Sequence, residues 1–369
     1  MRFLAERSRM MSKKMMVLVL SFCILLISGC QQKPTGVPHT ESSPQADERK
    51  IEISYPLTVR IGYSTGADDP RGIAIESFCR TVSEKTQGNI VFDIYPSGKL
   101  GSDSELINGM IEGSVDMTVS SAGNYALYAT KIGVSALPFL FDDFESAWAF
   151  IDSKEMQSLH TGLEKYNMHV LAYFDNGFRC VTSSESIGAI RTVGDMKGLN
   201  IRTPENQIVM ETMSELGANP RSYPFAGLQK ALADGVFDAQ ENPIPVIYNN
   251  GLYKVQKYLS VTNHSYDAMP LTIRQNIWEQ LTPEYQQIIA EAAVNAQTLN
   301  RHLVRQQTED CVAKLENKGM VIVYPDIKPF KDATAGVLDM FRTVYGEELI
   351  RFVANYQREN LKNTKLSKF

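Results

Sequence analysis

An alternation of short apolar strands with capped helices is the feature that most constrains the fold of this chain. The segments "LTVRIGYS" at 57–64 and "NIVFDIYP" at 89–96 are predicted strands, and a helical pattern lies between them. Pro70 suits the first turn of that helix, and either Asp68 or Asp69 is a natural N-cap. Strands that alternate with helices in this way predict an α/β fold whose sheet has mainly parallel strands.

The same alternation continues along the next part of the chain. Further strands are predicted at 115–119 and 169–177, and a helix at 205–217 that ends at Gly217. The segment 224–243 then repeats the pattern of a helix, a glycine and a short strand. With 369 residues, of which 43% are hydrophobic and 21% charged, the chain is long enough and apolar enough for two globular domains.

The segment near 282–318 has a different character, because about 36 residues run from Pro283 to the next glycine without an interruption. Thr282 suits the N-cap and Pro283 the first turn. A helix of this length extends roughly 55 Å at 1.5 Å per residue, beyond the usual globular length. The pattern predicts either two helices joined at a kink or one long helix that connects two lobes.

The first thirty residues have the features of an export signal. Basic residues precede the apolar run "MMVLVLSFCILLIS" at 15–28, which is too short for a comfortable membrane span. The run ends in "LISGC", which resembles a bacterial lipobox and so implies cleavage before Cys30 and acylation of its thiol. The alternative is an ordinary secretory signal with an incidental cysteine. We expect a lipoprotein signal peptide at 1–30 and a polar, flexible tether at 31–55 that holds a folded body near a membrane.

Charge and cysteine content exclude several classes of protein. The formal net charge is −5 and there is no basic stripe, so nothing indicates binding to nucleic acid. Beyond the signal, Cys79, Cys180 and Cys311 remain, and their odd number and wide spacing fit neither a disulfide framework nor a zinc site. Buried free cysteines are expected, although one bridge stays open.

Motifs of enzymes are missing from the sequence. There is no GxSxG, phosphate loop, GxGxxG or HExxH, and no two of the five histidines are spaced as a metal pair on a helix. His264, in "TNHSYD", is the one histidine considered for a cleft, and a lone histidine is weak evidence. We therefore predict no catalytic residue, no cofactor and no metal ligand.

Two arginines stand at or near predicted strand ends. Arg202 ends the strand in "GLNIRTP", and Arg179, in "DNGFRC", is predicted to lie just past another strand. In open α/β sheets, ligands bind outside the carboxyl ends of strands. A guanidinium matches a carboxylate in two parallel hydrogen bonds, so these arginines are candidate clamps for an organic acid. The alternative is a surface arginine paired with an acidic side chain.

Two further candidates lie near these arginines in the sequence. Asn242, in "DAQENP", precedes a proline that holds its backbone extended, and its amide can donate to and accept from a ligand. An Asx-type turn is the alternative for this residue. Phe225, in "YPFAGL", is either a wall of the cleft or a core aromatic residue.

Several motifs in series resemble the TRAP-transporter solute-binding proteins of the DctP family. They are "YPSGKLGSDSELINGMIEGSVDMT", "ALPFLFDD", "GDMKGLNIRTPEN", "YPFAGLQKALADGVFDAQENP" and "YKVQKYLSVTNH". The similarity covers about 57–345, in order and with compatible spacing.

The resemblance implies a two-lobe fold like that of periplasmic binding proteins. Each lobe is expected to be a sheet flanked by helices, with a hinge between the lobes and a long bracing helix near 282–318. Lobe I is expected at 56–176 plus 268–307, and lobe II at 177–267 plus 308–369.

The resemblance also implies a function without catalysis. A lipid-anchored, extracytoplasmic protein would capture a small organic acid and deliver it to the membrane permease subunits of a TRAP transporter. The position of Arg202 is the one that binds the ligand carboxylate in this family. Asn242 and Phe225 match two further ligand positions, and Arg179 matches another in a segment that is longer than usual.

Departures from the family pattern bear on the ligand. Where sialic-acid-binding members have an acidic residue after one strand, this chain has Ser120 and Ser121, and Ser64 stands where they have an asparagine. Both differences argue against sialic acid. A C4-dicarboxylate, a sugar acid such as a uronate, or another small hydroxy or keto acid remains. Glu205 and Asn206 follow Arg202 closely and suit recognition of hydroxyl groups.

Two other functions stay open at this point. An exported lyase or isomerase acting on a carboxylate would need a titratable group such as His264 or Glu241 beside the arginine clamp. A lipoprotein that senses the ligand and contacts a membrane receptor is the other alternative.

Overall fold

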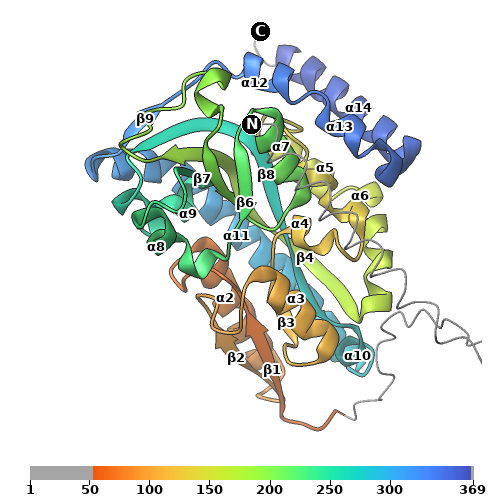
Figure 1. Ribbon diagram of the computed structural model, residues 1–369. Helices are drawn as coiled ribbons and strands as arrows, with labels where there is room; N and C mark the ends of the chain where they lie inside the picture. The colour runs from red at the N-terminus through yellow and green to blue at the C-terminus, as the bar shows by residue number, and fades with distance from the viewer. Residues whose placement is uncertain (1–52, 367–369) are drawn as a thin grey trace, which may run out of the picture. The chain divides into compact units, whose positions relative to one another are not determined.

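The computed structural model describes residues 53–366 (Figure 1). The expected signal peptide, most of the tether and Cys30 lie outside the described residues. No helix between residues 53 and 366 is both long enough and apolar enough to span a bilayer.

One mixed sheet contains the nine strands of the described residues, in the order β2-β1-β3-β8-β4-β7-β5-β6, with β9 beside β8. The strands are β1 Leu57–Gly62, β2 Ile90–Tyr95, β3 Met117–Val119, β4 Met168–Ser183, β5 Asn200–Thr203, β6 Asn219–Ser222, β7 Ala239–Pro243, β8 Tyr258–Arg274 and β9 Val321–Val323. Five of the neighbouring pairs are parallel, which the α/β pattern predicts. The three antiparallel pairs all involve β4 or β8.

The two long strands β4 and β8 join what the sequence predicts as two separate sheets. They pair from Met168↔Arg274 to Ser183↔Tyr258 and shift register three times on the way. β4 is 16 residues long and extends six residues beyond the predicted segment. The prediction that Arg179 lies just past a strand is therefore wrong, because this arginine lies inside β4 and pairs with β7 and β8.

Helices cover the sheet and connect its strands. They are α2 Pro70–Lys85, α3 Asp103–Glu112, α4 Ala122–Tyr125, α5 Phe144–Ile151, α6 Lys154–Ser158, α7 Gln207–Glu215, α8 Leu228–Ala233, α9 Ile244–Asn249, α10 Gln275–Trp278, α11 Pro283–Asn317, α12 Lys328–Ala333, α13 Val337–Met340 and α14 Arg342–Leu366. Asp69 caps α2 by accepting a hydrogen bond from the Arg71 amide, which decides between the two predicted N-caps.

The long segment after Thr282 forms a single helix, which confirms the prediction of one long helix over that of two helices joined at a kink. The 35-residue helix α11 begins with Thr282 accepting from the Tyr285 amide, and it extends roughly 52 Å. Its first half contributes Ile289 and Ala293 to a buried cluster with α2, and its second half contributes Leu315 to another with α8 and α9. The helix therefore packs against both parts of the sheet and braces them.

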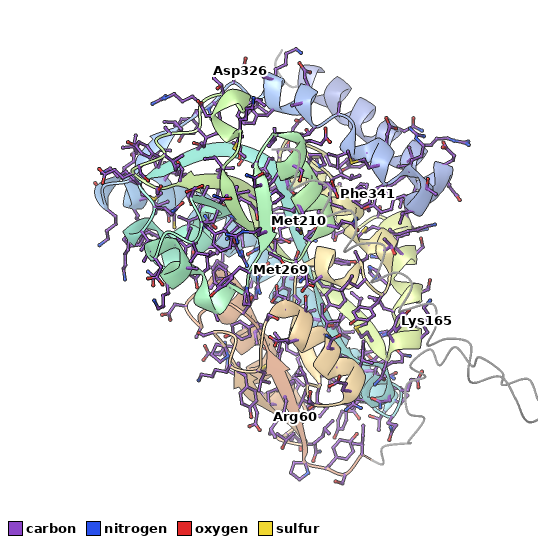
Figure 2. All side chains as sticks on the ribbon, viewed as in Figure 1. Arg60, Lys165, Met210, Met269, Asp326 and Phe341 are labelled. Atoms are coloured by element: carbon purple, nitrogen blue, oxygen red, sulfur yellow. The ribbon has the colours of Figure 1, made fainter. Side chains whose placement is uncertain are left out.

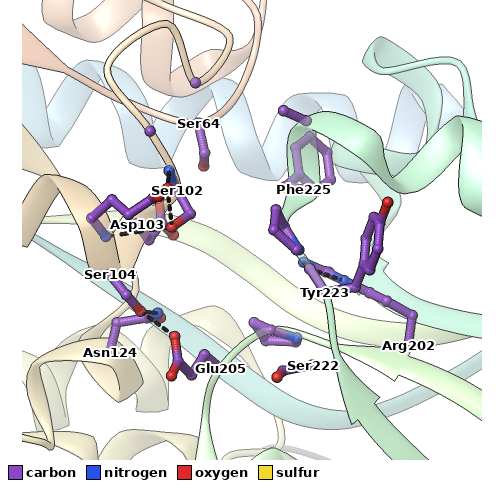
Figure 3. Close-up of a pocket in the computed structure, with 16 residues that line it drawn as sticks. Ser64, Ser102, Asp103, Ser104, Asn124, Arg202, Glu205, Ser222, Tyr223 and Phe225 are labelled. Carbon is purple, nitrogen blue, oxygen red and sulfur yellow. Dashed lines mark hydrogen bonds between the residues drawn. The ribbon is translucent and has the colours of Figure 1, made fainter.

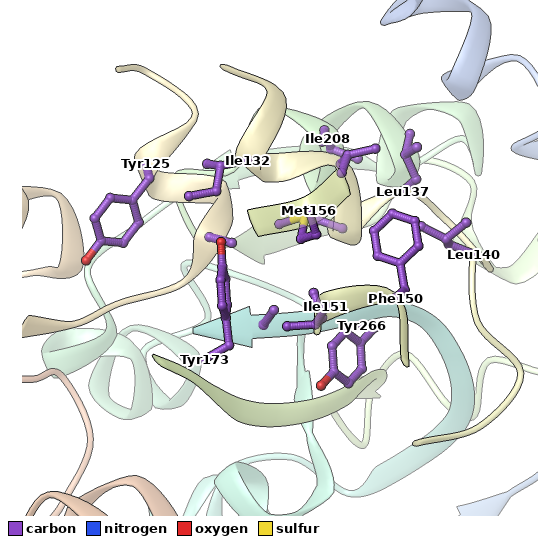
Figure 4. Packing of buried hydrophobic residues seen from close by; sticks show 14 of the residues in the cluster. Tyr125, Ile132, Leu137, Leu140, Phe150, Ile151, Met156, Tyr173, Ile208 and Tyr266 are labelled. Carbon is purple, nitrogen blue, oxygen red and sulfur yellow. The ribbon is translucent and has the colours of Figure 1, made fainter. Parts of the chain in front are cut away.

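Buried apolar side chains of residues 53–366 form four clusters around the sheet. The largest packs the segment from α4 to α6 onto β4 and β8 and includes Phe150, Met156 and Tyr266 (Figure 4). Met269 of β8 lies deep inside the protein, whereas Arg60 lies at its periphery (Figure 2). Cys79, Cys180 and Cys311 are all buried and free, as expected.

Asp175 of β4 is a buried acid whose charge destabilises the fold. Its side chain is 1% exposed, and Oδ2 accepts a hydrogen bond of 2.8 Å from Trp148 Nε1. Burial raises its pKa to about 6. The folded protein therefore holds this proton more tightly than the unfolded chain, and the free energy of unfolding falls as pH rises through about 4 to 6.

We expect Asp175→Asn to stabilise the protein by roughly 2–3 kcal/mol above pH 6, because the amide keeps an acceptor for Trp148 and carries no charge. Urea denaturation at several pH values between 4 and 8 measures this, and the variant should show a flatter pH dependence. Asp68→Asn, at an exposed position, is the control and should behave as the unaltered chain. Equal stability of Asp175→Asn and the unaltered chain at pH 8 would contradict the assignment.

Candidate ligand-binding site

A cavity of about 240 Å³ lies where β1, β5 and β6 end, the edge at which α/β sheets bind ligands (Figure 3). One wall comes from the segments after β1 and β2 and from α3 and α4. The facing wall comes from the end of β5, the end of β6 and the turn at Phe225–Gly227. The lining residues are Ser64, Gly98, Gly101, Ser102, Asp103, Ser104, Glu105, Asn124, Arg202, Pro204, Glu205, Ser222, Tyr223, Pro224, Phe225 and Ala226.

Arg202 lines this cavity as a buried cation. The residue is 4% exposed, and Nε and Nη2 donate to the carbonyl oxygen of Tyr223 at 2.8 and 2.5 Å. No carboxylate of the described residues lies within 4.0 Å of its guanidinium. Burial lowers the pKa of Arg202 to about 10, as expected for a buried cation without an adjacent carboxylate. An anionic ligand group would supply the missing partner.

Phe225 and Tyr223 form the aromatic part of the wall. The ring centre of Phe225 lies 5.9 Å from Arg202 Cζ, and the same ring packs against the buried cluster of α8 and α9. Phe225 therefore lies in the cavity wall, as predicted, and packs half-buried against the edge of a core cluster. Pro224 lies between β6 and the turn at Phe225–Gly227 and directs the chain from one to the other.

The opposite wall is polar, and of its residues the sequence predicted only Ser64. Ser102 and Glu105 form a capping box that starts α3, and this places Asp103 at the cavity. Ser104 Oγ donates to Glu205 Oε2 at 2.7 Å and accepts from Asn124 Nδ2 at 3.0 Å. One signal was available: these residues begin a helix directly after a strand and a turn, where ligand sites of α/β proteins lie.

The two walls touch each other beside the cavity. The hydrogen bond between Ser104 and Glu205 joins α3 to the segment after β5. A Cβ atom added at Gly123 of α4 would lie 1.9 Å from Asn206 Nδ2. Asn206 is the N-cap of α7, because its Oδ1 accepts hydrogen bonds from the amides of Ile208 and Val209. Asn206 therefore serves helix capping and wall contact, whereas Glu205 faces the cavity.

Arg179 lies in a neighbouring buried network. Its guanidinium pairs with Glu241 and donates from Nη1 to Asp267 Oδ2 at 2.6 Å. These two carboxylates outweigh the effect of burial and raise the pKa of Arg179. Burial alone would raise the pKa of Glu241, but Arg179 and His264 reverse this and lower it. Arg179, unlike Arg202, thus has carboxylate partners within the chain.

Asn242 and Ser121 belong to the same network. Asn242 Nδ2 donates to Gln240 Oε1 at 2.5 Å, and its Oδ1 accepts from Arg179 Nη2 at 3.4 Å. Ser121 Oγ donates to Asp267 Oδ1 at 2.6 Å.

The structure therefore brings together Arg202, Phe225, Glu205 and Ser64 around the cavity. Arg179, Asn242 and Ser121 do not line it, and they form the buried layer beside it. Ligand contacts of these three residues stay predictions.

Comparisons with known proteins agree on one family. Residues 61–343 match the family described as bacterial extracellular solute-binding protein, family 7 (DctP). The chain is 33% identical over 304 residues to the 2,3-diketo-L-gulonate-binding periplasmic protein YiaO of Escherichia coli K12, with 81% of this chain and 92% of that protein covered. It is 26% identical to the C4-dicarboxylate-binding protein DctB of Bacillus subtilis 168, with 85% and 90% covered.

A solved structure shows the same fold. The sugar acid binding protein DctPAm of Advenella mimigardefordensis, crystallised with galactonate, superposes with a TM-score of 0.79 at 30% identity, covering 83% of this chain and 99% of that one. The chain belongs to the DctP family of bacterial extracellular solute-binding proteins, the periplasmic binding proteins of TRAP transporters.

Proposed function

We propose that this protein captures a small organic acid through an Arg202–carboxylate clamp and delivers it to the membrane permease subunits of a TRAP transporter. The observation that carries the proposal is the buried guanidinium of Arg202, which lines a cavity and has no carboxylate partner among the described residues. A planar guanidinium binds a carboxylate through two parallel hydrogen bonds.

The names of the relatives support an acid as the ligand class. The three proteins compared above are described as binding 2,3-diketo-L-gulonate, C4-dicarboxylates and a sugar acid. The homologues are binding proteins. The two titratable side chains that an enzyme could use here, Glu241 and His264, are buried and paired with other residues of the chain. Glu241 is fully buried and paired with Arg179, and His264 Nε2 lies 3.3 Å from Glu241 Oε2.

Closure of two lobes around the acid is part of the proposal. The cavity walls come from the segments expected as lobe I, 56–176 plus 268–307, and lobe II, 177–267 plus 308–369. The hydrogen bond between Ser104 and Glu205 joins these two sets of segments and would form when the lobes close. Anchoring through acylated Cys30 would keep the protein beside its permease.

Thermal unfolding of the folded body with a panel of organic acids tests the proposal. A true ligand at one hundred times its dissociation constant should add about 2.7 kcal/mol to the free energy of unfolding. NMR of the bound acid should show no turnover. Stabilisation by neutral sugars equal to that by the matching acids would argue against a carboxylate clamp.

A further inference from the structure

We infer that the wall facing Arg202 recognises hydroxyl groups, so that the ligand is a polyhydroxylated monocarboxylate and not a dicarboxylate. This inference rests on the proposed function, because it takes the carboxylate at Arg202 as given. It concerns Asn124 and Asp103, two side chains of the polar wall that hold buried acceptor atoms without donors.

The hydrogen bonds of Ser104 decide which atom of Asn124 is left over. Ser104 has a single hydroxyl proton, and it donates this proton to the Glu205 carboxylate at 2.7 Å. Toward Asn124, 3.0 Å away, Ser104 can therefore act only as an acceptor, and the atom of Asn124 that faces it must be the amide nitrogen. Asn124 Oδ1 then lies on the other side of the amide. It is buried, has no hydrogen-bond partner among the described residues, and belongs to a side chain that is 3% exposed and lines the cavity.

Asp103 supplies a second acceptor of the same kind. Its Oδ1 is also buried without a hydrogen bond from a described residue, and its closest cation is Arg71 Nη1 at 3.9 Å. An ionised carboxylate only accepts hydrogen bonds. The wall thus offers two acceptors to anything that occupies the cavity, and a hydroxyl group is a donor that satisfies them.

The charges of the cavity argue against a second carboxylate at this end. Asp103, Glu105 and Glu205 all line the polar wall, whereas Arg202 is the only lysine or arginine among the lining residues. Arg71 lies behind Ser64, where its Nη1 donates to Ser64 Oγ at 3.1 Å and to the Val119 carbonyl. A ligand carboxylate placed here would meet acceptor atoms and negative charge.

Calorimetric titration with ligands of equal carbon number separates the alternatives. The four-carbon set is D-erythronate, butyrate and succinate, and the six-carbon set comprises stereoisomeric aldonates and uronates with hexanoate and adipate. We expect at least one polyhydroxylated acid to bind roughly 100-fold more tightly than the unsubstituted monocarboxylate and the dicarboxylate of its set, since both leave the buried acceptors without donors.

Variants then locate the effect. Asn124→Ala should lower the affinity for the most tightly bound polyhydroxylated acid by roughly 10- to 100-fold. The weak affinity for hexanoate or butyrate should change by no more than about threefold. Asn108→Ala is the matched control, because Asn108 is an exposed asparagine on α3 outside the cavity, and it should bind as the unaltered chain. If circular dichroism shows that Asn124→Ala does not fold, Asp103→Asn serves instead. This variant keeps the side-chain shape and should also lower the affinity for the same acid.

The outcomes distinguish this inference from the proposed function. If succinate or adipate binds most tightly and Arg202 is needed, only the hydroxyl-recognising wall is overturned, and Arg71 becomes the second cation. If Asn124→Ala and Asp103→Asn both fold and both bind the polyhydroxylated acid as the unaltered chain does, the wall is likewise overturned. If no acid of either set binds, or Arg202 is not needed, the proposed function itself fails.

Discussion

Arg202→Ala is expected to weaken binding of the acid ligand by roughly 30-fold to several thousand-fold. Truncating one partner of a buried, hydrogen-bonded charge pair costs on the order of 2–5 kcal/mol, and each 1.4 kcal/mol is a tenfold change in the dissociation constant. The guanidinium of Arg202 is buried at the cavity and is oriented by its hydrogen bonds to the Tyr223 carbonyl. The substitution therefore removes an oriented cation from the site. Calorimetric titration with the best ligand of the panel measures the change.

Two companion variants make this test specific. Arg202→Lys keeps the charge but loses the planar fork, so its affinity should fall between those of Arg202→Ala and the unaltered chain. Arg221→Ala is a matched control, because Arg221 is an exposed arginine that pairs with Arg202 across β5 and β6 and does not line the cavity. Near-normal affinity of Arg202→Ala, with Arg221→Ala also normal, would falsify the clamp.

Glu241→Ala is expected to reduce the free energy of unfolding by about 3 kcal/mol. Breaking a buried ion pair by removing one partner typically costs 3–5 kcal/mol, because the other charge stays buried without compensation. Glu241 is fully buried and balances Arg179 together with Asp267. Since Asp267 remains in the variant, the expected loss lies near the lower end of that range. Urea denaturation monitored by circular dichroism measures it.

A second substitution separates lost charge from lost packing. Glu241→Gln removes the charge but keeps the size of the side chain, so it should retain part of the stability that Glu241→Ala loses through packing. Asp234→Ala breaks an exposed pair with Lys230 and should leave the denaturation midpoint unchanged. A single variant that is as stable as the unaltered chain would show that Arg179 does not depend on Glu241.

Local signals predicted much of the fold. The absence of proline and glycine after Pro283 predicted the region of α11 correctly, and strand-helix alternation predicted the parallel part of the sheet. The strand β8 was missed because polar residues such as His264 and Asp267 interrupt its apolar pattern. Both are buried in the network around Arg179, so their burial depends on partners that no periodicity shows.

The candidate site was predictable from one strand end and from the family resemblance. Arg202 follows from its position at the end of a strand, Phe225 and Ser64 from the family resemblance, and Glu205 from closeness to Arg202. Arg179 has the same chemistry as Arg202, yet its partners Glu241 and Asp267 lie 62 and 88 residues away in the sequence.

Asn124 was missed for a related reason. Its free acceptor results from a chain of hydrogen bonds through Ser104 to Glu205, whose members come together only in the folded protein.

The close approach of Gly123 to Asn206 restricts how this protein can evolve. A methyl group at position 123 would overlap the Asn206 amide, and removing that amide with Asn206→Ala would give up the cap of α7. A side chain at position 123 therefore requires a smaller residue that still caps a helix, such as serine, at position 206. Substitutions at these two sites should therefore appear jointly along a lineage, although 82 residues of intervening sequence separate them.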